Sequence, residues 1–195
     1  DSYVRDSYVG RGETWEEFTI EAWIRQESMP VGSAEHYIAS SYNPMVFWFY
    51  IDQYGYVNFD FYTYNTNNQC CQRIYVDSTG KIGVNEWKHV AATINLTSGE
   101  AKIYIDGNLD TTQSFTAGSS GLYNNDCCYF YIGTNIHDWS NDNFDGKIDE
   151  VRLTKKALTT SEFILGASSV SNVPFQFRPQ IAAGRSPIIP GVRTL

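Results

Sequence analysis

The feature that most constrains the fold of this chain is a set of short segments in which apolar and polar residues alternate. One face of residues 18–24 carries Phe18, Ile20, Ala22 and Ile24, and the other face carries Thr19, Glu21 and Trp23. A period of two residues is typical of a strand with one face in the core and one face in water. The segment therefore predicts a half-buried β-strand.

Strand signals of this kind recur at short intervals along the chain. Residues 46–51 are apolar on both faces and predict a central strand. Further strands are expected at residues 56–62, 87–95, 101–105, 129–132 and 147–153. We interpret residues 1–10, which contain the sequence DSYV twice, as an edge strand and its approach.

Turn and helix signals complete the expected architecture. The pair Asp106-Gly107 between two strand signals predicts a type I′ hairpin. Thr159 stands three residues before Glu162, which matches a capping box and predicts one short helix, with residues 163–165 covering a sheet edge. Together these elements predict an all-β fold, a two-sheet antiparallel jelly-roll sandwich.

The character of the sequence changes after about residue 167. The last part of the chain contains Pro174, Pro179, Pro187 and Pro190. Proline blocks both helices and central strands. We therefore expect the sandwich to span residues 1–167 and an extended, proline-rich tail to span residues 168–195. Apolar residues in this tail suggest that it packs against its own domain or a neighbouring chain.

Length and charge argue against two classes of partner. The chain has 195 residues, which suits one all-β domain, and its formal net charge is −8 with only 14 Lys and Arg residues. We expect no electrostatic binding of nucleic acid or of an anionic membrane surface. No apolar stretch approaches the roughly 20 residues that a membrane-spanning helix needs.

Four motifs, in order, resemble the laminin-G-like modules of the concanavalin A-like lectin/glucanase superfamily. They are FTIEAWI at 18–24, NEWKHVA at 85–91, IYIDG at 103–107 and FDGKIDEVRL at 144–153, followed by the helix signal ALTTSE at 157–162. The resemblance spans roughly residues 13–165. It implies a two-sheet jelly roll, carbohydrate or protein binding, often outside the cell, and often one Ca²⁺ at the rim of the sandwich. The tail after Ser168 and the cysteine doublets depart from this pattern.

Catalysis is not expected. Glycosidases of this superfamily need two carboxylates flanking one glycosidic bond, usually in an E-x-D-x-x-E pattern, and this sequence lacks that pattern. Asp149 and Glu150 are adjacent, so in a strand they point to opposite faces. We interpret Asp149 as a structural carboxylate bonded to backbone or to Arg152, and His89 as a structural histidine within a strand.

A calcium site is a possible feature of residues 137–146. Asp138, Asn141, Asp142 and Asp145 offer the oxygen ligands that Ca²⁺ requires. The spacing does not match an EF-hand, and the alternative is a polar turn built on Asx geometry.

Two loops have the composition of a sugar site, since each combines tyrosine with polar amide and acidic side chains. The candidate residues are Tyr64 and Asn67 in the first loop and Tyr123, Asn125 and Asp126 in the second. We hypothesise that the two loops meet in space and form one rigid rim. The alternative is an ordinary tyrosine-rich surface.

Both loops end in a cysteine doublet, Cys70-Cys71 and Cys127-Cys128. Adjacent cysteines rarely bond to each other because the geometry is strained. Disulfides between the two doublets are therefore more plausible and would imply an oxidising compartment. The alternative is four partly buried free thiols.

The leading hypothesis is a non-enzymatic, lectin-like adhesion module on an extracellular or virion surface, which recognises a glycan or another cell-surface ligand. Its candidate cofactor is Ca²⁺. The alternative is a structural assembly or decoration protein of a viral or cell-surface appendage. In that case residues 173–195 would dock the sandwich onto neighbouring subunits.

Overall fold

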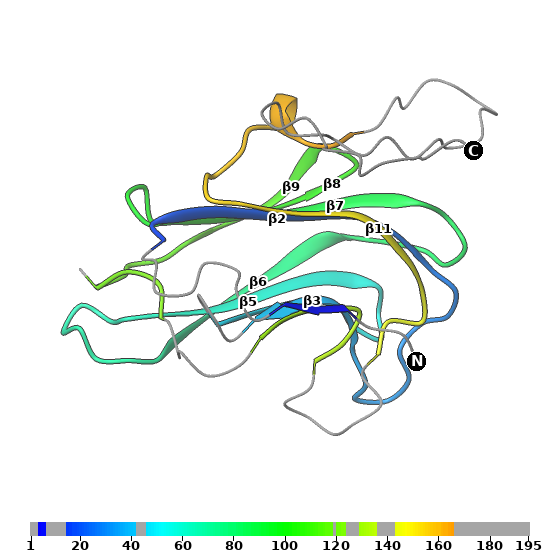
Figure 1. The fold of residues 1–195 in the computed structure, drawn as a ribbon, viewed down its shortest axis with the longest axis horizontal. Helices are drawn as coiled ribbons and strands as arrows, with labels where there is room; N and C mark the ends of the chain where they lie inside the picture. Colours follow the sequence, from blue (N-terminus) through cyan, green and yellow to red (C-terminus); the bar gives the residue numbers. More distant parts are fainter. Residues whose placement is uncertain are drawn as a thin grey trace, which may run out of the picture. The chain divides into compact units, whose positions relative to one another are not determined.

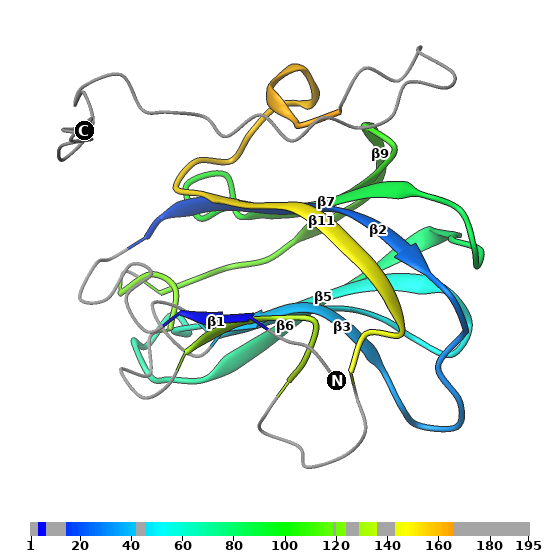
Figure 2. The same cartoon turned by 45° about the vertical axis from the view of Figure 1, so that its right-hand side comes forward.

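The computed structural model describes residues 4–6, 15–41, 46–118, 120–123, 129–135 and 143–165, with only the backbone of 4–6. These residues form two antiparallel sheets that pack face to face (Figures 1 and 2). The predicted all-β sandwich is therefore confirmed. The predicted tail lies outside the described residues. Within them, no helix is long and apolar enough to cross a membrane.

The described strands of the first sheet number six and follow the order β1-β10-β3-β4-β5-β6. Their bounds are β1 Val4–Asp6, β10 Phe130–Ile132, β3 His36–Ser41, β4 Phe47–Ile51, β5 Tyr56–Thr63 and β6 Gln72–Lys81. β1 lies at one edge and β4 lies between β3 and β5, which confirms the predicted edge strand and the predicted central strand. β3 and β6 were not predicted.

The described strands of the second sheet number five and follow the order β11-β2-β7-β8-β9. Their bounds are β11 Gly146–Thr154, β2 Glu17–Gln26, β7 Lys88–Asn95, β8 Glu100–Ile105 and β9 Asn108–Ser114. The turn between β8 and β9 has Asp106 at φ 51° and Gly107 at φ 75°. Two positive φ values are what a type I′ turn requires, so the hairpin prediction is confirmed.

The core lies between the two sheets and follows the alternation in the sequence. On β2, the apolar face of Phe18, Ile20, Ala22 and Ile24 is at most 1% exposed. The polar face is buried as well, because Thr19 and Glu21 are both 0% exposed. The prediction of a half-buried strand was therefore wrong for β2. The residues after β11 cover its second face.

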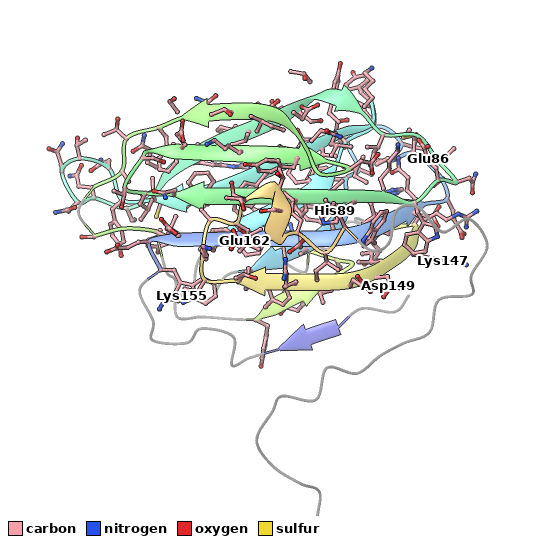
Figure 3. All side chains as sticks on the ribbon, turned by 90° about the horizontal axis from the view of Figure 1, so that it is seen from above. Glu86, His89, Lys147, Asp149, Lys155 and Glu162 are labelled. Atoms are coloured by element: carbon pink, nitrogen blue, oxygen red, sulfur yellow. The ribbon has the colours of Figure 1, made fainter. Side chains whose placement is uncertain are left out.

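The segment after β11 crosses the outer face of the second sheet (Figure 3). The predicted helix is a single 3₁₀ turn, Thr160–Glu162, and the Thr159 N–H donates to the Glu162 carboxylate at 2.9 Å. Phe163 is buried against Ala91 and Tyr104 on the sheet face, rather than covering an edge. We call residues 155–165 the strap.

The carboxylate of Glu21 fixes the strap to the sheet. Its Oε2 accepts hydrogen bonds from His89 Nε2 at 2.9 Å and from the Ile164 N–H at 2.8 Å. Its Oε1 accepts a hydrogen bond from Arg152, which also donates to the Glu162 carbonyl. Trp23 Nε1 donates to the Ile164 carbonyl at 2.8 Å. His89 is thus structural, as predicted.

The neighbourhood of Asp149 differs in part from the expectation. Its Oδ1 accepts the Glu150 N–H at 2.8 Å, which confirms a bond to backbone, but Arg152 pairs with Glu21 instead. The register of β11 against β2 shifts between Asp149 and Arg152, and Glu150 has φ 49°. A bulge of this kind re-aims the side chains that follow it.

Replacing Glu21 should destabilise the fold strongly. In the Glu21→Gln variant the charge is lost, and Arg152 keeps a half-buried charge without its partner. We expect a loss of about 3 kcal/mol in the free energy of unfolding, measured by urea titration. Glu100→Gln is the matched control, since that carboxylate pairs with Lys102 at the surface. Equal stability of Glu21→Gln and wild type would contradict the assigned role.

Glu21 should also make stability depend on pH. Burial raises the pKa of Glu21, but hydrogen bonds from His89, the Ile164 N–H and Arg152 outweigh burial and hold it below its ordinary value. The unfolded chain then takes up the proton more readily, so this stabilisation is present above the ordinary carboxyl pKa and is lost as pH falls through the folded-state pKa. The stability gap between wild type and Glu21→Gln should narrow from pH 6 to pH 3. If the difference in the free energy of unfolding instead widens from pH 6 to pH 3, the lowered pKa of Glu21 would be refuted.

Candidate functional site

The two tyrosine–asparagine loops meet where β5 ends. Thr63 forms an antiparallel bridge with Leu122, and its hydroxyl donates to the Gly121 carbonyl at 2.9 Å. The Tyr123 N–H donates to the Tyr62 carbonyl at 2.9 Å. The structure therefore brings together two segments that lie about sixty residues apart in the sequence. We call residues 62–71 and 120–123 the tyrosine rim.

Tyr64 and Tyr123 are in direct contact. Their ring centroids are 5.6 Å apart at an interplanar angle of 70°, an edge-to-face arrangement, and both side chains are half-buried. Burial and a hydrogen bond with the Cys71 thiol raise the pKa of Tyr123. Two fixed aromatic rings with partly open faces offer a stacking surface for an apolar ring face.

Asparagine side chains shape the rim around the tyrosines. Asn65 Oδ1 accepts the N–H groups of Asn67 at 2.9 Å and Gln69 at 3.0 Å, which is an Asx turn. Asn68 Oδ1 accepts the Ser120 N–H at 3.2 Å and so links the two loops. Asn67 is left exposed at the tip. The roles of Asn65 and Asn68 were not predicted, although the run of asparagines signals an Asx turn.

Close packing fixes the second loop against the first. The Gly118 N–H donates to the Tyr64 carbonyl at 2.6 Å. A Cβ at Gly118 would lie 2.0 Å from the Asn65 carbonyl oxygen and 2.7 Å from Asn68 Oδ1. Only glycine fits at this position without displacing backbone atoms.

Several predicted site residues lie outside the described residues. They are Asn125, Asp126, Cys127, Cys128, Asp138, Asn141 and Asp142. Cys70 and Cys71 are described and exposed, and Cys71 contacts Tyr123. The disulfides between the doublets stay a prediction.

The calcium prediction also stays open. Asp145 is exposed; its carboxylate accepts a hydrogen bond from Ser28 and its carbonyl accepts the Glu27 N–H at 2.8 Å. Within the described ranges, no three His, Cys, Asp or Glu side chains gather closely enough to hold a metal ion. Carboxylate and carbonyl oxygens suit Ca²⁺, and of the four predicted ligands only Asp145 has a described environment.

Several solved structures are similar to this chain. A protein from Bacteroides ovatus ATCC 8483, named for carbohydrate binding, is 24% identical with a TM-score of 0.62, and the match covers 87% of this chain and 45% of that one. A second structure is domain 4 of AbnA, an extracellular GH43 arabinanase from Geobacillus stearothermophilus, solved with arabinotriose. It is 20% identical with a TM-score of 0.52, and the match covers 82% of this chain and 68% of that one. The heptameric SAP-like pentraxin of Limulus polyphemus is 15% identical with a TM-score of 0.53. That match covers 82% of this chain and 72% of the pentraxin chain.

These likenesses establish the fold. The chain spans less than half the length of the Bacteroides protein. A comparison with curated proteins found no match. The family model Laminin_G_3, described as the concanavalin A-like lectin/glucanases superfamily, matches residues 7–163. The chain therefore belongs to the laminin-G-like family of the concanavalin A-like lectin/glucanase superfamily.

Proposed function

We propose that this chain is a non-enzymatic glycan-binding module that holds a sugar at the tyrosine rim. The observation that carries the proposal is the contact between Tyr64 and Tyr123 in a rim fixed by backbone hydrogen bonds. Sugars combine apolar ring faces with hydroxyl groups, and half-buried tyrosine rings beside an exposed Asn67 amide match both features. Fixing these groups before binding reduces the entropy cost of association.

The comparisons support the same class of ligand. The Bacteroides protein is named for carbohydrate binding, and the arabinanase domain was solved with arabinotriose. A botulinum neurotoxin of type C, 21% identical with a TM-score of 0.53, enters cells through two ganglioside molecules. We extend glycan binding to this chain on the strength of the rim geometry, and we place the module on a cell or virion surface where glycans are presented. Docking through residues 173–195 stays a prediction outside the described residues.

Loss of either rim tyrosine should weaken glycan binding. On a glycan array, Tyr64→Ala and Tyr123→Ala should each reduce the affinity for the bound glycan by about tenfold. Tyr54→Ala is the control, because Tyr54 is 61% exposed in the turn before β5, away from the rim. A wild-type protein that binds no glycan, with or without Ca²⁺, would refute the proposal. Loss of binding in a chelator would support the proposed Ca²⁺ site that includes Asp145.

The shape of the rim should matter as much as its tyrosines. In Gly118→Ala the new methyl group would collide with Asn65 and displace the asparagine loop. Glycan affinity should fall while the core stays folded, since Gly118 lies outside the core cluster. Circular dichroism and the array give the two readouts, and Thr116→Ala, at an exposed site two residues away, is the control. Unchanged affinity in Gly118→Ala would show that the rim does not need this conformation.

A further inference from the structure

The outer face of the first sheet carries a cluster of aromatic and charged side chains on three neighbouring strands. The inward residues of β4, β5 and β6 belong to the core cluster, so their alternating neighbours point away from the core. From these outward residues we define the aromatic shelf: Trp48 on β4, Asp60 on β5, and Arg73 and Tyr75 on β6. Trp48 pairs across the strands with Asp60, and Asp60 pairs with Tyr75.

The guanidinium group of Arg73 is held between two aromatic rings. Its Cζ lies 4.9 Å from the Trp48 ring centroid and 4.6 Å from the Tyr75 ring centroid. Its Nη2 donates to Asp60 Oδ2 at 2.6 Å. Two cation–π contacts and one ion pair thus position a side chain that is otherwise rich in rotamers. Arg73 therefore links β6 to β5 and β4 on this face.

The carboxylate that pairs with Arg73 is buried. Asp60 is 0% exposed, and burial raises its pKa although Arg73 and the Tyr50 hydroxyl favour the charged form. Its Oδ1 is buried and has no hydrogen-bond partner among the described residues. A buried acceptor without a partner lowers stability. Asp60 faces away from the core, and through Oδ2 it positions the guanidinium group of Arg73 on the outer face of the sheet.

The shelf is open on the side of β6. The Tyr75 side chain is 56% exposed and that of Arg73 is 36% exposed. Toward β3 the same face is buried, since Tyr37 is 6% exposed and Ser40 is 0% exposed. The exposed Tyr75 ring thus lies beside the guanidinium group of Arg73, and the neighbouring face toward β3 is covered. This arrangement suits a ligand that lies along the sheet.

The shelf continues into the tyrosine rim along β5. Tyr62 packs edge-to-face on Trp48 at a centroid distance of 5.4 Å, and Tyr64 follows Tyr62 two residues later on the same side of the chain. Tyr64 stands four residues after Asp60, which corresponds to about 13 Å of extended chain. This distance exceeds the length of one sugar ring, so shelf and rim together can contact successive units of a chain.

The charges of the shelf favour a neutral ligand. Asp60 compensates the charge of Arg73, and Asp77 adds an exposed carboxylate on the outer face of β6. The whole chain has a net charge of −8, which repels acidic glycans. The N–H groups of Arg73 can donate to sugar hydroxyls while the Tyr75 ring stacks on a sugar face.

We propose that the aromatic shelf is a second sugar subsite, which binds the further units of a neutral, linear polysaccharide whose end lies at the tyrosine rim. This inference rests on the proposed glycan-binding function. It predicts that affinity rises with chain length, and that the rise depends on Tyr75 and Arg73.

The test compares short and long neutral chains by calorimetry. The probes are xylo-, arabino-, manno- and cello-oligosaccharides of two and six units, with hexagalacturonate as the acidic probe. For the series that binds, wild type should bind the six-unit chain at least about tenfold more tightly than the two-unit chain. Tyr75→Ala and Arg73→Lys should remove most of this advantage and leave two-unit binding unchanged. Tyr54→Ala, with a similarly exposed tyrosine at 61%, should behave as wild type.

Each outcome separates the two proposals. If Tyr64→Ala abolishes binding of both lengths while Tyr75→Ala and Arg73→Lys match Tyr54→Ala, rim binding stands and the shelf subsite is refuted. If hexagalacturonate binds most tightly, the neutral ligand class is refuted. If wild type binds none of the probes or any arrayed glycan, both proposals fail. Thermal unfolding of each variant confirms that the sandwich is intact before binding is compared.

Discussion

The buried carboxylate of Glu21 is the interaction on which the second sheet depends. Donors from β7, β11 and the strap reach its two oxygens, so one side chain on β2 joins three other parts of the chain. A carboxylate at 0% exposure is tolerable only because its acceptor sites are filled by charged and polar donors. The strap in turn excludes water from this cluster, so that the cover and the anchor stabilise each other.

The outer faces of the two sheets differ, because the strap that Glu21 binds covers only the face of the second sheet. The strap packs Phe163 over the outer face of the second sheet, near His89 and Tyr104. On the first sheet, the strands toward β6 leave aromatic and charged side chains exposed, with Tyr75 as the most open. A contiguous exposed apolar patch on a folded surface can mark an interaction site. The covered face therefore contributes to stability, and the ligand contacts that we propose lie on the open one.

Sequence patterns predicted the core and the hairpins but not the polar anchors. The alternation in residues 18–24 identified the inward face of β2, because burial of every second residue leaves a direct trace in the sequence. The same pattern placed Glu21 in water. Its partners His89, Arg152 and Ile164 lie 68, 131 and 143 residues away, so only the fold reveals them.

Two edge strands, β6 and β9, are hard to recognise in the sequence for a related reason. β6 has an outward face of charged and polar residues around Tyr75, and β9 is exposed or half-buried along its length. Neither has the apolar content of a typical strand, because each has neighbours on one side only.

The candidate site was predictable to the extent that it is local. The rim loops were identified by composition, since tyrosine and asparagine lie within each loop. The aromatic shelf could not be identified in this way. Trp48, Asp60 and Arg73 come from three strands, and their contact depends on the register of β4 against β5 and of β5 against β6.

Glu21 and Asp60 are both buried carboxylates on outward faces, yet their environments shift their pKa values in opposite directions. Both oxygens of Glu21 accept hydrogen bonds, and its pKa is lowered despite burial. In Asp60 only Oδ2 has partners among the described residues, and burial raises its pKa. A stability anchor should satisfy every acceptor, as Glu21 does. Asp60 pairs through Oδ2 with Arg73, whose guanidinium group lies at the surface between β4 and β6, so its contacts position a surface group where those of Glu21 join buried parts of the fold.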